Sequence, residues 1–144
     1  MLVHIVYSDA GKNFQLAGSV TSYGCWCQLR NEQASGIVQG HGAPVDGLDA
    51  ACRSWHQCRS CTVSDFSNAS CDPNNNAYEI GFDPVTMRID CQFNPTDCQI
   101  NNCKCDENLA HALTQLIDEF SSEFVTTSDG GFDHVNECKV VVLY

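Results

Sequence analysis

Residues 42–58 read GAPVDGLDAACRSWHQC. Asp46 is suited to capping a helix. After it, apolar side chains and cysteines recur at steps of three and four residues: Leu48, Cys52, Trp55 and Cys58. That spacing places side chains on one face of a helix. The sequence therefore predicts a helix over about 47–61.

The chain is acidic and rich in cysteine. Its 144 residues include 11 cysteines, and 7 Lys+Arg stand against 18 Asp+Glu, a net charge of −11. Such a cysteine content is typical of disulfide-stabilised extracellular proteins, and a strongly negative surface repels nucleic acids. The sequence shows neither an apolar run of membrane-spanning length nor a signal peptide. We therefore expect one mature, secreted domain over 1–144, with no nucleic-acid partner and no transmembrane segment.

The first half of the chain contains two further patterns. Residues 2–7 form a short apolar opening, whereas residues 28–43 include three glycines and have the chemistry of a loop. Asn68-Ala69-Ser70 is an N-glycosylation sequon. We expect Asn68 to lie in a surface loop as a candidate glycosylation site.

The second half of the chain predicts a hairpin, a helix and a tail. Apolar residues alternate over 78–90 around Asp83-Pro84, which indicates a β-hairpin. Leucines and other apolar residues at helical spacing predict a second helix from near Asp106 to about residue 122. The tail, 123–144, ends in an apolar run that is consistent with an edge strand.

Three blocks of sequence resemble the secreted phospholipase A2 family. They are YGCWC at 23–27, the GAPVDGLD that opens 42–58, and the cysteine-rich run from Cys91 that ends in CKCD at 103–106. The match covers about 20–113, and its cysteine spacings agree across separate segments. The resemblance implies a mainly α, disulfide-rich fold with two long antiparallel helices bridged by disulfides, a short amino-terminal helix and a β-hairpin wing.

The same resemblance implies five disulfides: Cys25–Cys138, Cys27–Cys52, Cys58–Cys105, Cys71–Cys98 and Cys91–Cys103. A second helix–helix bridge of the family would fall on Ala51 and Ala112, so both of its partners are missing together. Cys61 is left over, either as a free buried thiol or as the bridge of a disulfide-linked homodimer. Cys58 and Cys61 also have the CxxC spacing of redox motifs and of zinc half-sites. Both roles are disfavoured, because Cys58 is expected to form a disulfide between the two helices.

Active members of this family hold a histidine that acts as a base toward water, followed directly by an aspartate that binds calcium. The spacing of the cysteines on the 47–61 helix places Trp55 at the base position and His56 at the calcium position. Asp106 matches the aspartate that orients the base, and Tyr78 matches a tyrosine that bonds that aspartate. We therefore predict that the chain has no catalytic residues at these family-equivalent positions.

The calcium site of the family is also predicted to be defective. Calcium prefers hard oxygen ligands, and His56 supplies an imidazole instead. Sixteen residues separate Cys27 from Pro44, where the family has a short glycine-rich arc, and Gln28 and Arg30 stand where glycine is usual. The sequence thus predicts no metal and no cofactor.

An alternative alignment shifts the helix by one residue, so that His56 becomes the base and Gln57 replaces the aspartate. Such a slip turns a helix by about 100°, which would point His56 away from Asp106 or break the bridge at Cys58. In the favoured alignment, Asp106 lacks its imidazole. We expect Asp106 to accept a hydrogen bond from the Trp55 indole or from the Tyr78 hydroxyl instead.

The sequence is compatible with three functions, which belong to different classes of protein. The leading interpretation is a catalytically inactive secreted binding or matrix protein, similar in logic to the otoconin-type branch and associated with a calcium mineral surface. The second is a lipid-binding or toxin-partner subunit, for which the weaker candidates that line an apolar channel are Leu2, Ile5, Val6 and Trp26. The third is a calcium-dependent phospholipase A2 with a remodelled site that uses His56.

Overall fold

The computed structural model describes residues 22–28, 40–66, 71–72, 76–86, 88–126 and 131–139. Several sequence predictions lie outside these residues. They are the amino-terminal helix with Leu2, Ile5 and Val6, the loop residue Arg30, the sequon at Asn68, and the strand at the end of the tail.

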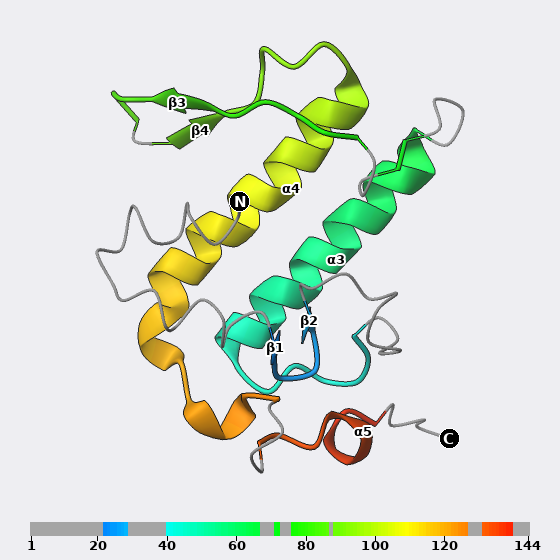
Figure 1. The fold of residues 1–144 in the computed structure, drawn as a ribbon, viewed down its shortest axis with the longest axis vertical. Coiled ribbons are helices and arrows are strands. Elements are labelled where there is room, and N and C mark those ends of the chain that lie inside the picture. The colour runs from blue at the N-terminus through cyan, green and yellow to red at the C-terminus, as the bar shows by residue number, and fades with distance from the viewer. Residues whose placement is uncertain are drawn as a thin grey trace. The chain divides into compact units, whose positions relative to one another are not determined.

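The described chain is mainly helical, with two long helices and two small antiparallel sheets (Figure 1). The elements in chain order are β1 (Ser22–Tyr23), β2 (Cys27–Gln28), α3 (Gly47–Asp65), β3 (Gly81–Asp83), β4 (Arg88–Asp90), α4 (Asp97–Leu116), the 3-10 turns η3 (Ile117–Glu119) and η4 (Ser122–Phe124), and α5 (His134–Glu137). The expected fold class, mainly α and disulfide-rich with two long helices and a hairpin, is confirmed.

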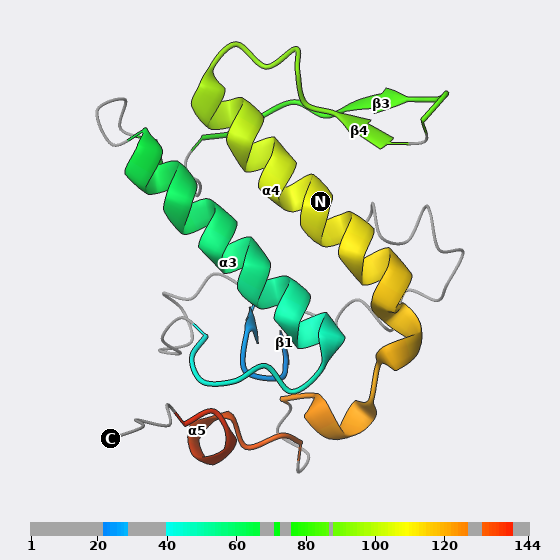
Figure 2. The ribbon, with the colours of Figure 1, turned by 180° about the vertical axis from the view of Figure 1, so that it is seen from behind.

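The contacts divide the chain into two compact units, and α3 and α4 pass through both. The first unit holds 1–53 and 110–144, and the second holds 54–109. Within the second unit, the later part of α3 and the earlier part of α4 lie side by side and antiparallel (Figures 1 and 2). Cys58–Cys105 joins them there.

Cystine sulfur supplies much of the core in both units. Five disulfides join Cys25 to Cys138, Cys27 to Cys52, Cys58 to Cys105, Cys71 to Cys98 and Cys91 to Cys103, the same pairs that the resemblance implied. The buried aliphatic side chains of the core are Leu48, Leu113 and Ile117 in the first unit and Leu109 in the second. With few large aliphatic side chains buried among the described residues, such crosslinks are expected to contribute much of the stability.

Helix α3 begins where the sequence predicts and continues beyond the predicted end. The Asp46 carboxylate accepts the backbone N–H of Asp49 at 2.9 Å, which caps the first turn. The helix ends at Asp65 rather than near 61. In this extension Thr62 is buried, and its hydroxyl donates to the Cys58 carbonyl at 3.0 Å, so the last turn gains a polar contact of its own.

Helix α4 begins at Asp97, so the predicted start near Asp106 is wrong. The missing first half contains cysteines and asparagines rather than leucines, and therefore lacks an aliphatic stripe. Its cysteines Cys98, Cys103 and Cys105 are nevertheless buried. The Thr96 hydroxyl accepts the backbone N–H of Gln99 at 3.2 Å, which marks the start of the helix.

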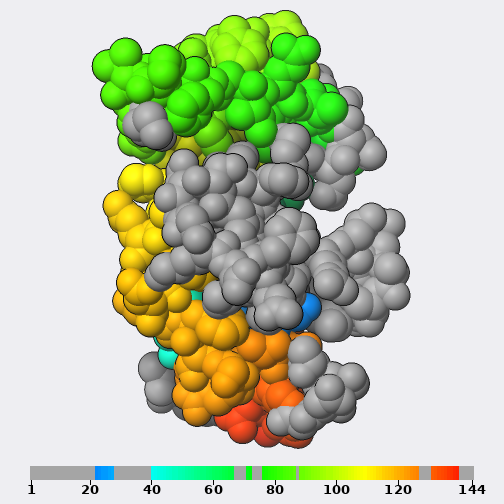
Figure 3. Space-filling model, turned by 60° about the vertical axis from the view of Figure 1, so that its left-hand side comes forward, coloured from blue at the N-terminus to red at the C-terminus, as the bar shows by residue number. Residues whose placement is uncertain are grey.

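The predicted hairpin forms as the three-residue strands β3 and β4, in which Phe82 faces Ile89. Its turn is stabilised by Asp83, whose carboxylate accepts the backbone N–H groups of Val85 and Thr86 at 2.8 and 3.3 Å. These hydrogen bonds lower the pKa of Asp83. The hairpin lies at the surface (Figure 3), and Val85 is 90% exposed.

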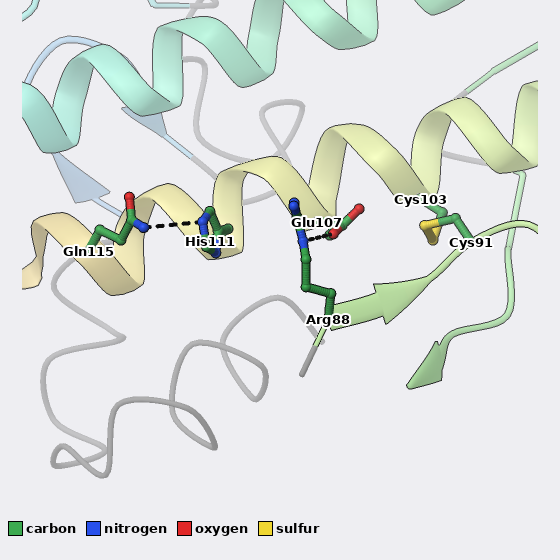
Figure 4. A network of polar contacts seen from close by, with 6 residues as sticks. All are labelled: Arg88, Cys91, Cys103, Glu107, His111 and Gln115. Atoms are coloured by element: carbon green, nitrogen blue, oxygen red, sulfur yellow. Dashed lines mark hydrogen bonds and ion pairs between the residues drawn. A yellow bond between two sulfur atoms is a disulfide. The ribbon is translucent and has the colours of Figure 1, made fainter. Parts of the chain in front are cut away.

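Two contacts fix the end of the hairpin to α4 within the second unit. Cys91 is bridged to Cys103, and Arg88 pairs with Glu107 at 2.9 Å (Figure 4). The Arg88 side chain is half exposed in this pair, and an ion pair open to solvent on one side contributes little. The covalent bridge therefore does most to hold the strand against the helix.

Candidate functional site

A carboxylate with two hydrogen-bond donors joins the facing parts of α3 and α4. The Trp55 indole nitrogen Nε1 donates to Oδ1 of Asp106 at 2.6 Å. The Tyr78 hydroxyl donates to the other carboxylate oxygen, Oδ2. The sequence predicted that one of these groups would bond Asp106, and the structure has both. Each oxygen of the carboxylate therefore has a donor of its own.

Burial and charge around this carboxylate favour the protonated tyrosine. Desolvation, followed by the hydrogen bond to Asp106, raises the pKa of Tyr78 far above its ordinary value, and Arg59 opposes this in part. The Arg59 guanidinium lies 4.5 Å from the centroid of the Trp55 ring. The His56 ring packs edge-on against the same indole at 4.8 Å. Trp55 is thus held by a hydrogen bond and by two ring contacts.

The indole at position 55 cannot perform the task of an imidazole. Its N–H is a donor only, with no lone pair in the ring plane to accept a proton. A general base must accept a proton from the attacking water. Here the indole donates to Asp106, and therefore occupies the carboxylate oxygen that would otherwise orient a base.

A second buried carboxylate, Asp49, organises the turn between β1 and β2. Its Oδ1 accepts the backbone N–H groups of Trp26 and Cys27 at 2.7 and 3.2 Å, and its Oδ2 accepts those of Cys25 and Val45 at 2.9 and 3.0 Å. Asp49 is fully buried. These four backbone donors surround its charge, which offsets the cost of removing it from water.

Gly24 is required by the same arrangement. Its φ is +57°, and a Cβ at this position would lie 2.5 Å from the carboxyl carbon of Asp49. Neither the β1–β2 hairpin nor the role of Asp49 was predicted from the sequence. The available signal was an acidic residue three positions after the capping Asp46, next to the buried Leu48 and therefore on the inner side of the helix.

Comparison with known proteins places these features in a family. Over 92 residues, 64% of the chain, it is 34% identical to a group 10 secretory phospholipase A2 from Rattus norvegicus. It is 30% identical over 104 residues, 72% of the chain, to a neutral phospholipase A2 paradoxin-like beta chain from Oxyuranus microlepidotus. A basic phospholipase A2 from Micrurus corallinus is 30% identical over 94 residues. The chain is phospholipase A2-like.

The likeness covers part of each relative. The matched region is 51% of the length of the rat protein, 61% of the Oxyuranus protein and 56% of the Micrurus protein. No protein-family model matches the chain. Among the described residues, no helix combines the length and the apolar character needed to cross a membrane.

Calcium does not fit the donor set of this phospholipase A2-like chain at the family position. The side chain that directly follows Trp55 is His56, a nitrogen ligand, whereas calcium binds six to eight oxygens. In the described part of the chain, no group of three or more histidine, cysteine or acidic side chains is arranged to hold a metal ion.

Trp26, a weaker candidate for ligand binding, has structural contacts of its own. Its indole nitrogen donates to the Gly42 carbonyl at 3.1 Å, and the Arg53 guanidinium lies 5.6 Å from its ring centroid. Trp26 is half-buried. A ligand-binding role for this side chain stays a prediction, because the channel residues proposed with it lie outside the described chain.

Cys61 is unpaired and its residue is exposed on α3. Of the two alternatives left open by the sequence, a buried thiol and an exposed one able to form an intermolecular bridge, the exposure favours the second. The homodimer itself stays a prediction.

Proposed function

We propose that the chain is a catalytically inactive, secreted phospholipase A2-like protein with a binding or matrix role. The single observation that supports this most is the hydrogen bond from the Trp55 indole to Asp106 at 2.6 Å. Where hydrolysis needs a proton acceptor beside the orienting aspartate, this chain has a proton donor. The secreted location is supported by relatives that are secretory phospholipases A2 and by the five disulfides.

The imidazole at position 56 supports the same conclusion independently. In the family, calcium polarises the ester carbonyl. That role needs a cation with free coordination positions, held by protein oxygens. Replacing the carboxylate by His56 removes a full negative charge and a hard ligand from the site. The base and the electrophile are therefore both altered at adjacent residues, and reverting either one alone would leave the other defect in place.

The binding role proposed is attachment to a calcium mineral surface through carboxylates. The chain carries a net charge of −11. Many of its acidic side chains are exposed in the described residues: Asp65, Glu79, Asp90, Asp97, Asp118, Glu119, Glu123, Asp133 and Glu137. Carboxylate oxygens are the ligands that calcium prefers. Several weak contacts made by one protein molecule add up through multivalency.

Phospholipid hydrolysis with and without calcium tests the loss of catalysis. We expect no calcium-dependent release of fatty acid above the blank, and no difference between the unaltered chain and His56→Ala. Calcium-dependent turnover that His56→Ala abolishes would overturn the proposal and support the remodelled phospholipase. Fatty acid retained through native purification would instead favour the lipid-binding alternative.

Adsorption to calcium carbonate tests the binding role. We expect the unaltered chain to adsorb and to change crystal habit, and the triple variant Asp118→Asn, Glu119→Gln, Glu123→Gln to adsorb less. The matched control, Asp118→Glu, Glu119→Asp, Glu123→Asp, keeps the charge and should adsorb as the unaltered chain does. Equal adsorption by the neutralised and charge-preserving variants would count against these carboxylates.

A further inference from the structure

The bridge between Cys71 and Cys98 meets two side-chain amides at one of its sulfurs. The Nδ2 group of Asn76 donates to Sγ of Cys98 at 3.3 Å, and Nδ2 of Asn102 donates to the same atom at 3.7 Å. Asn102 is buried, and its Oδ1 has no hydrogen-bond partner among the described residues. The sulfur of Cys98 is therefore the atom toward which both amides are directed.

Amides placed in this way favour the reduced form of the bridge. A disulfide sulfur is a weak acceptor, whereas hydrogen bonds to an ionised acceptor are roughly twice as strong as neutral ones. Cys98 also lies in the first turn of the 20-residue helix α4, where the helix dipole stabilises negative charge. The two amide contacts therefore become stronger when Cys98 is released as a thiolate.

Burial and one neighbouring carboxylate act against that thiolate. Cys98 is 6% exposed, but the other buried half-cystines are exposed by 4% or less, so burial does not disfavour this bridge more than the others. Asp97, the preceding residue, is itself exposed, and solvent and salt therefore screen its charge. The direct contacts with the two amides are not screened in this way.

The bridge between Cys58 and Cys105 is the main competitor, because Cys58 is half-buried and therefore easier to reach. Its partner Cys105 lies beyond the first turn of α4. The Thr62 hydroxyl is 3.7 Å from Sγ of Cys105, but it donates to the Cys58 carbonyl at 3.0 Å. A hydroxyl has a single proton, so a Cys105 thiolate would lack the donors that Cys98 has.

We propose that Cys71–Cys98 is a redox-sensitive bridge, which a dithiol reductant opens before the other disulfides. In the first step, a thiolate of the reductant attacks Sγ of Cys71, the bond to Cys98 breaks, and Cys98 leaves as a thiolate. The second thiol of the reductant then displaces Cys71 from the mixed disulfide. Two electrons pass from the dithiol to the bridge, and the two protons of the dithiol end on the two cysteines.

Opening this bridge affects the segment that leads to Tyr78. Cys71 lies outside the helices and strands, between α3 and β3. The Gln99 side chain donates from Nε2 to the Ala77 carbonyl at 2.8 Å, which also ties this segment to the start of α4. Tyr78 follows directly, and its hydroxyl donates to Asp106. Reduction removes a covalent link from this segment, so the contact between Tyr78 and Asp106 becomes sensitive to the supply of thiols.

Partial reduction of the folded chain tests the proposal. The Cys61→Ser variant is used, so that every labelled thiol comes from a bridge. It is exposed to dithiothreitol without denaturant, quenched with N-ethylmaleimide and analysed by peptide mass spectrometry. We expect label on Cys71 and Cys98 before any other pair. With glutathione, a monothiol, the mixed disulfide should form on Cys71. Earlier label on another pair, simultaneous opening of all five bridges, or glutathione on Cys98 would each overturn the proposal.

Asn76→Ala tests the role of the amides, because it removes the nearer donor. Reduction of this bridge should become about threefold slower. Asn101→Ala is the matched control, since its amide belongs to the same helix but donates to the Asp97 carbonyl at 2.8 Å. The control should keep the original rate. A general loss of packing would speed reduction, so the direction of the change separates the two effects. An unchanged or faster rate in Asn76→Ala, or equal slowing in Asn101→Ala, would contradict the role of the amides.

Discussion

The hydrogen bond between Trp55 and Asp106 has an ionised acceptor, unlike that of Trp26, whose indole donates to a backbone carbonyl. Hydrogen bonds to charged groups contribute about 1.5–3 kcal/mol, against about 0.5–1.5 kcal/mol for neutral pairs. Trp55→Phe is therefore expected to lower the free energy of unfolding by about 2 kcal/mol, measured by denaturant titration.

Trp26→Phe is the matched control for that variant, because both indoles are half-buried and both lie beside an arginine. It removes a neutral hydrogen bond and should cost about 1 kcal/mol. Equal losses, or a larger loss for Trp26→Phe, would show that the carboxylate contact does not stabilise the site as described.

The four hydrogen bonds to Asp49 are divided equally between its two oxygens, which makes the isosteric amide a sharp probe. In Asp49→Asn, one oxygen becomes an NH₂ group that faces two backbone N–H donors, either those of Cys25 and Val45 or those of Trp26 and Cys27. The lost charge-assisted bonds and the unsatisfied donors should cost about 3–5 kcal/mol, measured by thermal or denaturant unfolding. Glu123→Gln, at an exposed residue, should stay within about 0.5 kcal/mol. A loss that small in Asp49→Asn would contradict the network.

Among the elements, the turn of the β3–β4 hairpin responds to acid. Its Asp83 has a lowered pKa, first because it accepts the Val85 N–H and then because it accepts that of Thr86. The stabilisation is therefore present above the unfolded pKa of aspartate, and it is lost as pH falls through the lowered, folded value.

Nuclear magnetic resonance can follow this loss through the Asp83 carboxyl signal and the amide signals of Val85 and Thr86. The midpoint should lie below the ordinary aspartate value, and the two amides should shift with it. Asp83→Asn should show no such transition. A midpoint at or above the ordinary value would be inconsistent with the turn hydrogen bonds.

The elements differ in how far local sequence predicts them. Helix α3 was predictable because a cap and an apolar stripe coincide, whereas the first half of α4 was not, because its buried residues are half-cystines and Asn102. Only the pairing of those cysteines identifies them as internal. The β1–β2 hairpin depends on Asp49, twenty-one residues beyond β2 by sequence number, so no local pattern in its two-residue strands could reveal it.

The candidate site was predictable to the extent that cysteine spacing sets the alignment. That spacing placed Trp55, and the family resemblance added Asp106 and Tyr78; all three meet in the structure. The stacking of Arg59 on Trp55 was not predicted, because it depends on side-chain direction within one turn of the helix.

For the whole molecule, the five disulfides should not contribute equally. Cys58 and Cys105 are 47 residues apart in sequence, and Cys91 and Cys103 only 12. Chain-entropy arguments give about 4 kcal/mol for the longer loop and about 3 kcal/mol for the shorter one. Replacing both cysteines of a pair by alanine should therefore cost more at 58 and 105. A larger loss at 91 and 103, measured by denaturant unfolding, would mean that native packing rather than loop length sets the order.

The exposed thiol of Cys61 should govern self-association. We expect one thiol per chain to react with a maleimide in the absence of denaturant, and a fraction of purified chain to migrate as a dimer on a non-reducing gel. Reducing agent or Cys61→Ser should remove that band. Monomer alone under non-reducing conditions would eliminate the disulfide-linked dimer.

Asp49 also bears on the order in which the bridges form during synthesis. Cys27 and Cys52 are 25 residues apart, whereas Cys25 waits for Cys138, which is 113 residues further along the chain. The carboxylate holds the backbone N–H groups of both Cys25 and Cys27. Once α3 has been synthesised, Asp49 can hold the backbone at Cys25 and Cys27, and Cys27 already has its disulfide partner, Cys52. The same carboxylate that satisfies a turn in the finished protein would thus hold the backbone at Cys25 in place until Cys138 has been synthesised.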